Sequence, residues 1–280
     1  MLPERKFSEI LTNSKLDKKT ANILVEGESD QTILREFFNG TALRHKLYPA
    51  SRVSFDLFDA NVLGGNKGRL YAASTFLSAI QARRIVCVID RDGDAFHKHI
   101  YNSCGVITDL SCVEIYPLDI SQAANFIRKA LNDGFDESDL MHILSIAREI
   151  SVLRWMREEV IPSVKMADYD KSLTLEKKRL SLNVQHWIGR SKSRGGTQEE
   201  WKKLEDSFTS LRSTLSGDPR DAVNIHILDE IFRYWFKSVF ETKLHEGWIE
   251  QLLRGFAEFD LLKNYKFFES LLSHCEGHIE

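Results

Sequence analysis

Acidic residues follow directly after an unbroken apolar segment near the middle of the first half of the chain. Ile85–Ile89 is apolar at every position, and the sequence DRDGD follows at residues 90–94. In extended backbone, residues i and i+2 point to the same side, so Asp90 and Asp92 can bind one cation together. Carboxylate oxygens of this kind suit Mg²⁺ or Mn²⁺. Asp90 and Asp92 are therefore candidate metal ligands and catalytic residues, and Asp94 is an additional candidate.

A second acidic group follows another apolar segment nearer the start of the chain. Ala21–Glu26 (ANILVE) ends on a carboxylate, and Asp30 comes after the tight turn that a glycine permits. The alternative is that Asp30 or a neighbouring serine simply caps a helix, where such residues are favourable. Glu26 can serve as a ligand or as a proton acceptor. We expect four acids to bind the metal ion: Glu26, Asp30, Asp90 and Asp92.

A glycine-rich stretch lies between these two acidic groups. Residues 64–68 read GGNKG, whose backbone amides can approach a phosphate while Lys67 offers a positive charge. A plain turn with a solvated lysine is the alternative. Lys67 is thus a candidate catalytic residue that stabilises a phosphate group.

Short apolar segments and amphipathic stretches alternate over residues 1–120. We expect helices from about Asp30 to Phe38 and from the glycine-rich turn to about Gln81. Brief apolar runs predict strands at Ala21–Glu26, Val53–Asp59, Ile85–Ile89 and Cys112–Leu118. This order predicts an α/β fold with a mainly parallel sheet flanked by helices, and with its functional loops at the carboxyl ends of the strands.

The sequence texture changes after about residue 120. Apolar residues then recur at spacings of three and four, which predicts a mostly α-helical C-terminal half with a flexible loop at residues 189–197. We therefore expect two domains, a catalytic one over 1–120 and a helical one over 121–280 for substrate, partner or self-association contacts. The aromatic stretch Ile231–Phe240 favours core packing, and a face for self-association or docking is the alternative.

Composition excludes several classes of protein. With 42% hydrophobic residues in 280, the chain can bury a substantial core and is not disordered. Its net charge of −3 gives no overall positive field to attract nucleic acid. No segment approaches the roughly 20 apolar residues of a membrane span, so we expect a soluble, cytoplasmic protein with no membrane partner. The four cysteines form no CxxC pair, which indicates buried free thiols.

Positive charge is concentrated in one segment of the C-terminal half. Between Ile161 and Gly195, eight basic residues accompany three acidic ones, a net charge of +5. With His186 and Trp187 beside it, this segment can bind an RNA backbone and stack a base. A solvated helix face and loop would have the same composition. The candidate nucleic-acid-binding residues are Lys177, Lys178, Arg179, Arg190, Lys192 and Arg194.

The combined order of the three N-terminal motifs resembles the Toprim domain of topoisomerases, bacterial primases and several nucleases. The resemblance covers about residues 20–120. It implies that Glu26, Asp90 and Asp92 bind Mg²⁺ and act on phosphodiesters, with Asp30 as a further acid. Glu114, in the sequence VEIY, resembles the acid of a Glu-Asn-Tyr element found in stand-alone Toprim-like proteins, although isoleucine replaces the asparagine here.

The size and layout of the chain resemble, more narrowly, the AriB nuclease subunits of PARIS anti-phage defence systems. This resemblance implies a toxic effector of abortive infection that an AriA-like ABC-type ATPase partner holds inactive until a phage protein is sensed. It also implies that the released nuclease, as a homodimer, cleaves host transfer RNA in preference to DNA and blocks translation.

Two other functions are compatible with the same residues. The sequence DRDG at residues 90–93 also resembles the nucleophile loop of haloacid-dehalogenase-type phosphatases, with Asp90 as nucleophile, although that function gives Glu26 no role. A non-catalytic Toprim-like module that binds nucleic acid or a partner is the other alternative.

Overall fold

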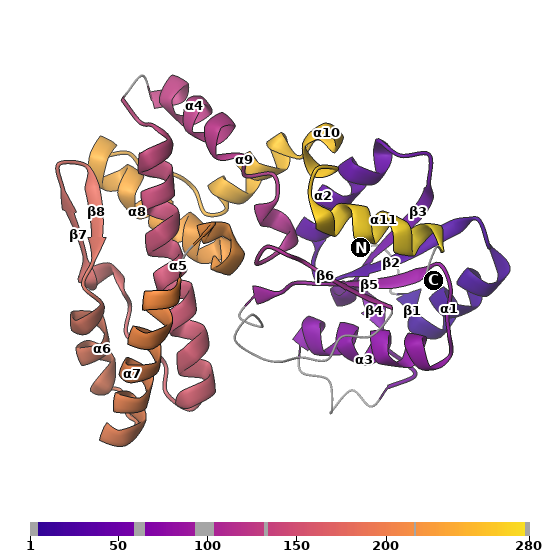
Figure 1. The fold of residues 1–280 in the computed structure, drawn as a ribbon, viewed down its shortest axis with the longest axis horizontal. Coiled ribbons are helices and arrows are strands. Elements are labelled where there is room, and N and C mark those ends of the chain that lie inside the picture. Colours follow the sequence, from indigo (N-terminus) through magenta and orange to yellow (C-terminus); the bar gives the residue numbers. More distant parts are fainter. Residues whose placement is uncertain (1–4, 59–64, 93–103, 132–133, 216, 278–280) are drawn as a thin grey trace. The chain divides into compact units, whose positions relative to one another are not determined.

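The computed structural model of the chain describes residues 5–58, 65–92, 104–131, 134–215 and 217–277 (Figure 1). The chain divides into two compact units, of which the first comprises Met1–Pro117 with Leu252–Glu280 and the second comprises Leu118–Gln251. The segment from Leu252 onward thus belongs with the N-terminal residues, and the expected domain 121–280 is wrong in this respect. Sequence periodicity identifies this segment as helical, but periodicity does not indicate which part of the protein the helices pack against.

A sheet of four parallel strands forms the centre of the first unit, which confirms the predicted fold class. The strand order is β3 (Arg44–Pro49), β2 (Thr20–Val25), β5 (Ile85–Ile89) and β6 (Gly105–Ile107). Every residue of β2 and β5 is buried, as expected for continuous apolar strands in the middle of a parallel sheet.

Helices cover both faces of this sheet (Figure 1). Ile23 of β2 packs with α2 (Glu28–Asn39) and α11 (Lys266–Glu276). Leu24 packs with α1 (Phe7–Leu16) and α3 (Gly65–Ala79) on the other face. Alternate side chains of one strand therefore contribute to two separate hydrophobic clusters.

The expected strand at Val53–Asp59 is shorter than predicted. Only β4 (Val53–Ser54) is extended, and it pairs in parallel with β1 (Arg5–Lys6). Phe55 is buried against Phe7, with ring centroids 5.7 Å apart. The apolar alternation in this segment thus reflects aromatic packing of a loop on α1.

Two strands of the four-stranded sheet were not expected from the sequence. The edge strand β3 (RHKLYP) is mostly polar and only half-buried, and β6 has just three residues, so neither has a distinct apolar pattern. Conversely, the expected strand Cys112–Leu118 is a 3₁₀ turn, η3 (Val113–Ile115). Val113, Ile115 and Tyr116 are all buried, and their succession produced the strand-like pattern.

The second unit is mostly helical, as predicted, with a β-hairpin that was not expected. The hairpin pairs β7 (Leu173–Glu176) with β8 (Arg179–Leu182). The helices are α4 (Ile120–Leu131), α5 (Glu137–Val160), α6 (Val184–Lys192), α7 (Gln198–Thr214), α8 (Ile225–Phe240) and α9 (Trp248–Phe256), which continues past the boundary between the units. Short helical turns of the second unit are η4 (Asp170–Ser172) and η5 (Pro219–Ala222), and those of the first unit include η1 (Ala50–Arg52) and α10 (Phe259–Leu262).

The aromatic stretch of α8 is part of the core of the second unit. Phe232 and Trp235 are buried, and the Phe232 ring stacks on Trp248 with centroids 5.3 Å apart. The predicted core packing of these residues is confirmed. All four cysteines are free and buried, also as predicted. None of the described helices is long and apolar enough to cross a lipid bilayer.

Candidate metal centre

The topology of the sheet brings two of the predicted acids together. From β2 the chain crosses to β3 on one side, and it then returns through α3 to β5 on the other side of β2. Ligands bind outside the carboxyl ends of the strands at such a reversal of strand order. Glu26 follows β2 and Asp90 follows β5 at this point, and the Asp90 N–H donates a hydrogen bond to Glu26 Oε1 at 3.1 Å.

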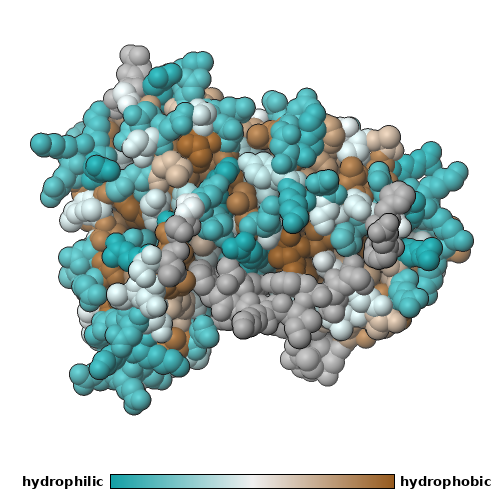
Figure 2. Space-filling view, viewed as in Figure 1, coloured by the Kyte–Doolittle hydropathy of each residue, from teal (hydrophilic) through white to brown (hydrophobic). Residues whose placement is uncertain are grey.

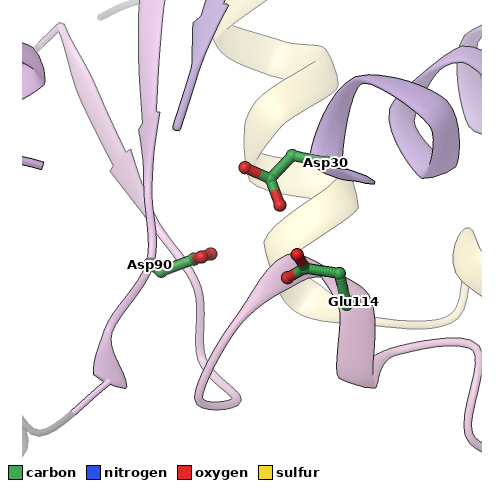
Figure 3. A group of neighbouring side chains, drawn as sticks. All are labelled: Asp30, Asp90 and Glu114. Atoms are coloured by element: carbon green, nitrogen blue, oxygen red, sulfur yellow. The ribbon is translucent and has the colours of Figure 1, made fainter. Parts of the chain in front are cut away.

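Three carboxylates converge at this edge of the sheet. Asp30 lies in the first turn of α2, Asp90 follows β5, and Glu114 lies in η3; their side chains face one another (Figure 3). One oxygen from each lies within 4.8 Å of the other two. Among the described residues, this acidic triad is the only group of three or more His, Cys, Asp or Glu side chains that approach so closely.

The contacts of Asp30 answer the question of whether it merely caps a helix. Its Oδ2 accepts a hydrogen bond from the Gly27 N–H at 2.8 Å, which is a capping contact at the start of α2. Its Oδ1 is buried and receives no hydrogen bond from the part of the chain that the structure describes. Capping therefore accounts for one oxygen of Asp30 and leaves the other without a donor.

A backbone hydrogen bond connects the segments that carry the other two members of the triad. Asp90 Oδ1 accepts a hydrogen bond at 2.9 Å from the Val113 N–H, at the start of η3. Because Glu114 is the next residue, this bond holds the 3₁₀ turn against the end of β5. The contribution of the Val113 amide could not be predicted from the sequence, because every residue except proline carries a backbone N–H and only the fold selects this one.

Burial and mutual repulsion disfavour the ionised forms of these acids. Burial is the largest cause of the raised pKa values of Asp30 and Asp90. The Glu114 charge raises the pKa of Asp30 further, and Asp30 and Glu114 do the same for Asp90. A divalent cation is the ordinary way to satisfy gathered carboxylates, and a donor set of oxygens alone suits Mg²⁺ or Mn²⁺. The residues present therefore fit the predicted ion.

Glu26 and Asp92 lie beside a positive charge. Lys67 Nζ is 3.2 Å from Asp92 Oδ2 and donates to the Arg91 carbonyl at 3.4 Å. Burial first, and then the Asp92 charge, raise the pKa of Glu26 to about 7, although Lys67 opposes this. Asn66 of α3 also donates to the Glu26 carbonyl at 3.0 Å. Glu26, Lys67 and Asp92 thus form a second group, which the Glu26–Asp90 hydrogen bond connects to the triad.

The predicted ligands are therefore divided between two adjacent groups. Of Glu26, Asp30, Asp90 and Asp92, only Asp30 and Asp90 belong to the acidic triad, and Glu114, an additional candidate, completes it. The other additional candidate, Asp94, lies outside the described residues. The GGNKG segment was expected to be a turn, but from Gly65 onward it forms the first turn of α3, which carries Lys67.

One contact at the start of α2 comes from the far end of the chain. Arg254 donates a hydrogen bond to Ser29 Oγ at 2.7 Å. It thereby links the C-terminal segment of the first unit to the helix that carries Asp30. The sequence offered no signal for this contact, because 225 residues separate its two partners.

The predicted nucleic-acid-binding residues occupy two places in the second unit. Lys177, Lys178 and Arg179 are exposed at the turn between β7 and β8. The other three make internal contacts: Arg190 donates to the Asp168 carbonyl at 2.7 Å, Arg194 to the Met166 carbonyl at 2.9 Å, and Lys192 pairs with Glu205 at 2.8 Å. The surface formed by α6 and α7 is mostly hydrophilic (Figure 2).

Two expectations about this segment are wrong. Trp187 was expected to stack a base, but it is fully buried, and its Nε1–H donates to the Ala167 carbonyl at 2.6 Å. The loop expected at residues 189–197 is shorter, because α6 extends to Lys192. Trp201 donates to the Gly195 carbonyl at 2.8 Å and so fixes the remaining connection. The spacing of basic residues and tryptophans could not distinguish a packed helix from a binding surface.

The sequence was compared with models of protein families and with curated proteins, and neither comparison found a match.

Proposed function

We propose that this protein is a Mg²⁺- or Mn²⁺-dependent nuclease of the Toprim kind. One observation carries the proposal: Asp30, Asp90 and Glu114 come from three separate elements and place carboxylate oxygens within 4.8 Å of one another. The unsatisfied Oδ1 of Asp30 supports a cation at this point. The position at the carboxyl ends of adjacent parallel strands is where α/β sheets bind ligands.

Each group of side chains has a distinct role in this proposal. Asp30, Asp90 and Glu114 hold the ion, which when bound would neutralise negative charge that develops on the scissile phosphodiester. Glu26 lies outside the triad and accepts or returns a proton near Asp90. Lys67 places a positive charge at the same edge, where it orients a phosphate, and Asp92 positions the Lys67 ammonium through their 3.2 Å ion pair.

RNA is the substrate class that we propose. The exposed Lys177, Lys178 and Arg179 offer three positive charges at one hairpin turn, which suits a phosphate backbone. The resemblance in size and layout to the AriB nuclease subunits supports transfer RNA as the substrate. It likewise supports a cytoplasmic anti-phage effector that an ABC-type ATPase restrains and that acts as a homodimer.

A phosphatase with Asp90 as nucleophile is less well supported. Such a residue must present an oxygen to the substrate, whereas Asp90 is only 8% exposed and one of its oxygens accepts the Val113 N–H. That function also gives Glu26 no role. A non-catalytic binding module would not need a buried acidic triad, whose repulsion is costly without a cation.

The proposal is tested by incubating the purified protein with total cellular RNA and with supercoiled plasmid DNA, in Mg²⁺ or in EDTA. We expect Mg²⁺-dependent RNA fragments of transfer-RNA size on a denaturing gel. Asp90→Asn should reduce cleavage by roughly a hundredfold or more while the circular dichroism spectrum is retained. Glu36→Gln is the matched control, because Glu36 is an exposed acid on the same helix as Asp30.

Three results would refute the proposal. They are equal cleavage in EDTA, full activity in Asp90→Asn, and a phosphorylated Asp90 trapped from a phosphate ester. Nicking of DNA without cleavage of RNA would refute the substrate class and retain the metal-dependent site.

A further inference from the structure

The second unit contains a cavity of about 470 Å³ that the proposed nuclease function does not use. Its walls come from α5, from residues 168–170, from α8 and from residues 243–244. Tyr169 is buried at 6% exposure and forms part of the lining. The volume lies in the range of about 300–1,000 Å³ that is typical of small-molecule sites.

The acidic residues that line this cavity have other contacts. Glu230 accepts a hydrogen bond from the Tyr169 hydroxyl. Asp170 Oδ1 accepts the Lys171 N–H at 2.6 Å. The Asp168 side chain is 80% exposed and faces Arg194 at 3.9 Å. The acids of the lining are thus occupied by hydrogen bonds within the unit or are largely solvated.

Two arginines of the lining are held in place by the second unit. The Arg154 guanidinium lies over the Tyr169 ring, with its carbon 5.1 Å from the centroid. Arg233 pairs with the buried Asp229 at 2.8 Å, and Asp229 also accepts the Gly247 and Ile249 N–H groups. A planar guanidinium fixed in this way retains free donors and a face on which a base can stack.

Two lysines add positive charge to the same cavity. Lys237, on α8, and Lys243 are exposed lining residues. Neither has an ion pair or a hydrogen bond from its side chain within the described ranges of the chain. Tyr234, one turn before Lys237, presents an aromatic ring to the lining. The cavity therefore combines four cations with aromatic surface.

We propose that this cavity binds a nucleoside monophosphate. Lys237 and Lys243 contact the phosphate together with Arg233, and the base lies against Tyr234 and the Arg154 guanidinium. Glu230 can accept a hydrogen bond from the ribose or the base. The inference depends only on the second unit, and it holds whether or not the acidic triad supports cleavage.

Isothermal titration calorimetry on the full chain, in EDTA, tests this inference. The probes are AMP, adenosine and inorganic phosphate. We expect AMP to bind roughly tenfold more tightly than adenosine, which lacks the phosphate group, and roughly tenfold more tightly than inorganic phosphate, which lacks the nucleoside. An affinity for AMP no higher than that for adenosine or for phosphate would overturn the proposal.

Charge reversal identifies the cavity as the site. The double variant K237E/K243E should weaken AMP binding by roughly tenfold or more. K202E/K203E is the matched control, because Lys202 and Lys203 are exposed on α7 and do not line this cavity. An equal effect of the two double variants would contradict the assignment. The measurement involves no cleavage, so it is independent of the proposed nuclease activity.

Discussion

Replacement of Glu26 by glutamine should stabilise the metal-free protein at neutral and alkaline pH. Burial raises the pKa of Glu26 from its ordinary 4.5 to about 7, and the Asp92 charge adds to the shift. Because the folded-state pKa is higher than the unfolded-state value, the folded protein holds this proton more tightly. The stability contributed by protonation is complete below about pH 4.5 and is lost as the pH rises through about 7.

The expected size of the effect follows from this shift. A change from 4.5 to about 7 corresponds to roughly 3 kcal/mol of unfolding free energy, at about 1.4 kcal/mol per pKa unit. Glutamine is neutral and can still accept the Asp90 N–H through its side-chain oxygen. Glu26→Gln should therefore match the wild type near pH 4.5 and exceed it by roughly 3 kcal/mol near pH 8.

Urea denaturation in EDTA between about pH 4.5 and pH 8.5 measures this difference. Ionisation of the buried Asp30 and Asp90 also destabilises the folded protein, in the wild type and in the variant alike. The difference in unfolding free energy between the two proteins therefore isolates the contribution of Glu26. Glu28→Gln is the matched control, because Glu28 is exposed and pairs with Arg52 at the surface; it should change the free energy of unfolding by less than about 1 kcal/mol. Parallel profiles for Glu26→Gln and the wild type would refute the reasoning, as would an advantage that grows toward acidic pH.

Three further predictions follow from the same structure. Mg²⁺ should raise the melting temperature of the wild type near neutral pH and leave Glu114→Gln unchanged in a thermal-shift assay; an equal rise in both would exclude Glu114 as a ligand. Tyr116→Phe should cost about 1–3 kcal/mol in urea denaturation, because the hydroxyl accepts the Asp109 and Leu110 N–H groups; a loss below about 0.5 kcal/mol would contradict this. Ellman's reagent should label none of the four cysteine thiols in the folded protein and all four in denaturant, because burial shields Cys87, Cys104, Cys112 and Cys275 and raises the pKa of several of them. Labelling of the native protein at neutral pH would be inconsistent with the structure.

Local sequence patterns were sufficient for the elements that are buried on both faces. Ile85–Ile89 has no polar residue, so a central parallel strand was the consistent interpretation, and β5 has the predicted bounds. The edge strand β3 was not identified, because its half-buried residues are mostly polar. The segment Cys112–Leu118 was misassigned, because consecutive buried residues in a 3₁₀ turn have the same apolar pattern as a strand.

The sequence by itself determined that acids follow two apolar strands, and that their chemistry suits a divalent cation. Tertiary structure decided which of these acids meet. Sheet order placed β2 beside β5, and a hydrogen bond from the Val113 backbone placed Glu114 against Asp90. The packing of α11 on β2 likewise joined the C-terminal residues to the first unit. Local propensities act over a few residues, whereas contacts between distant segments depend on how whole helices and sheets bury their apolar faces.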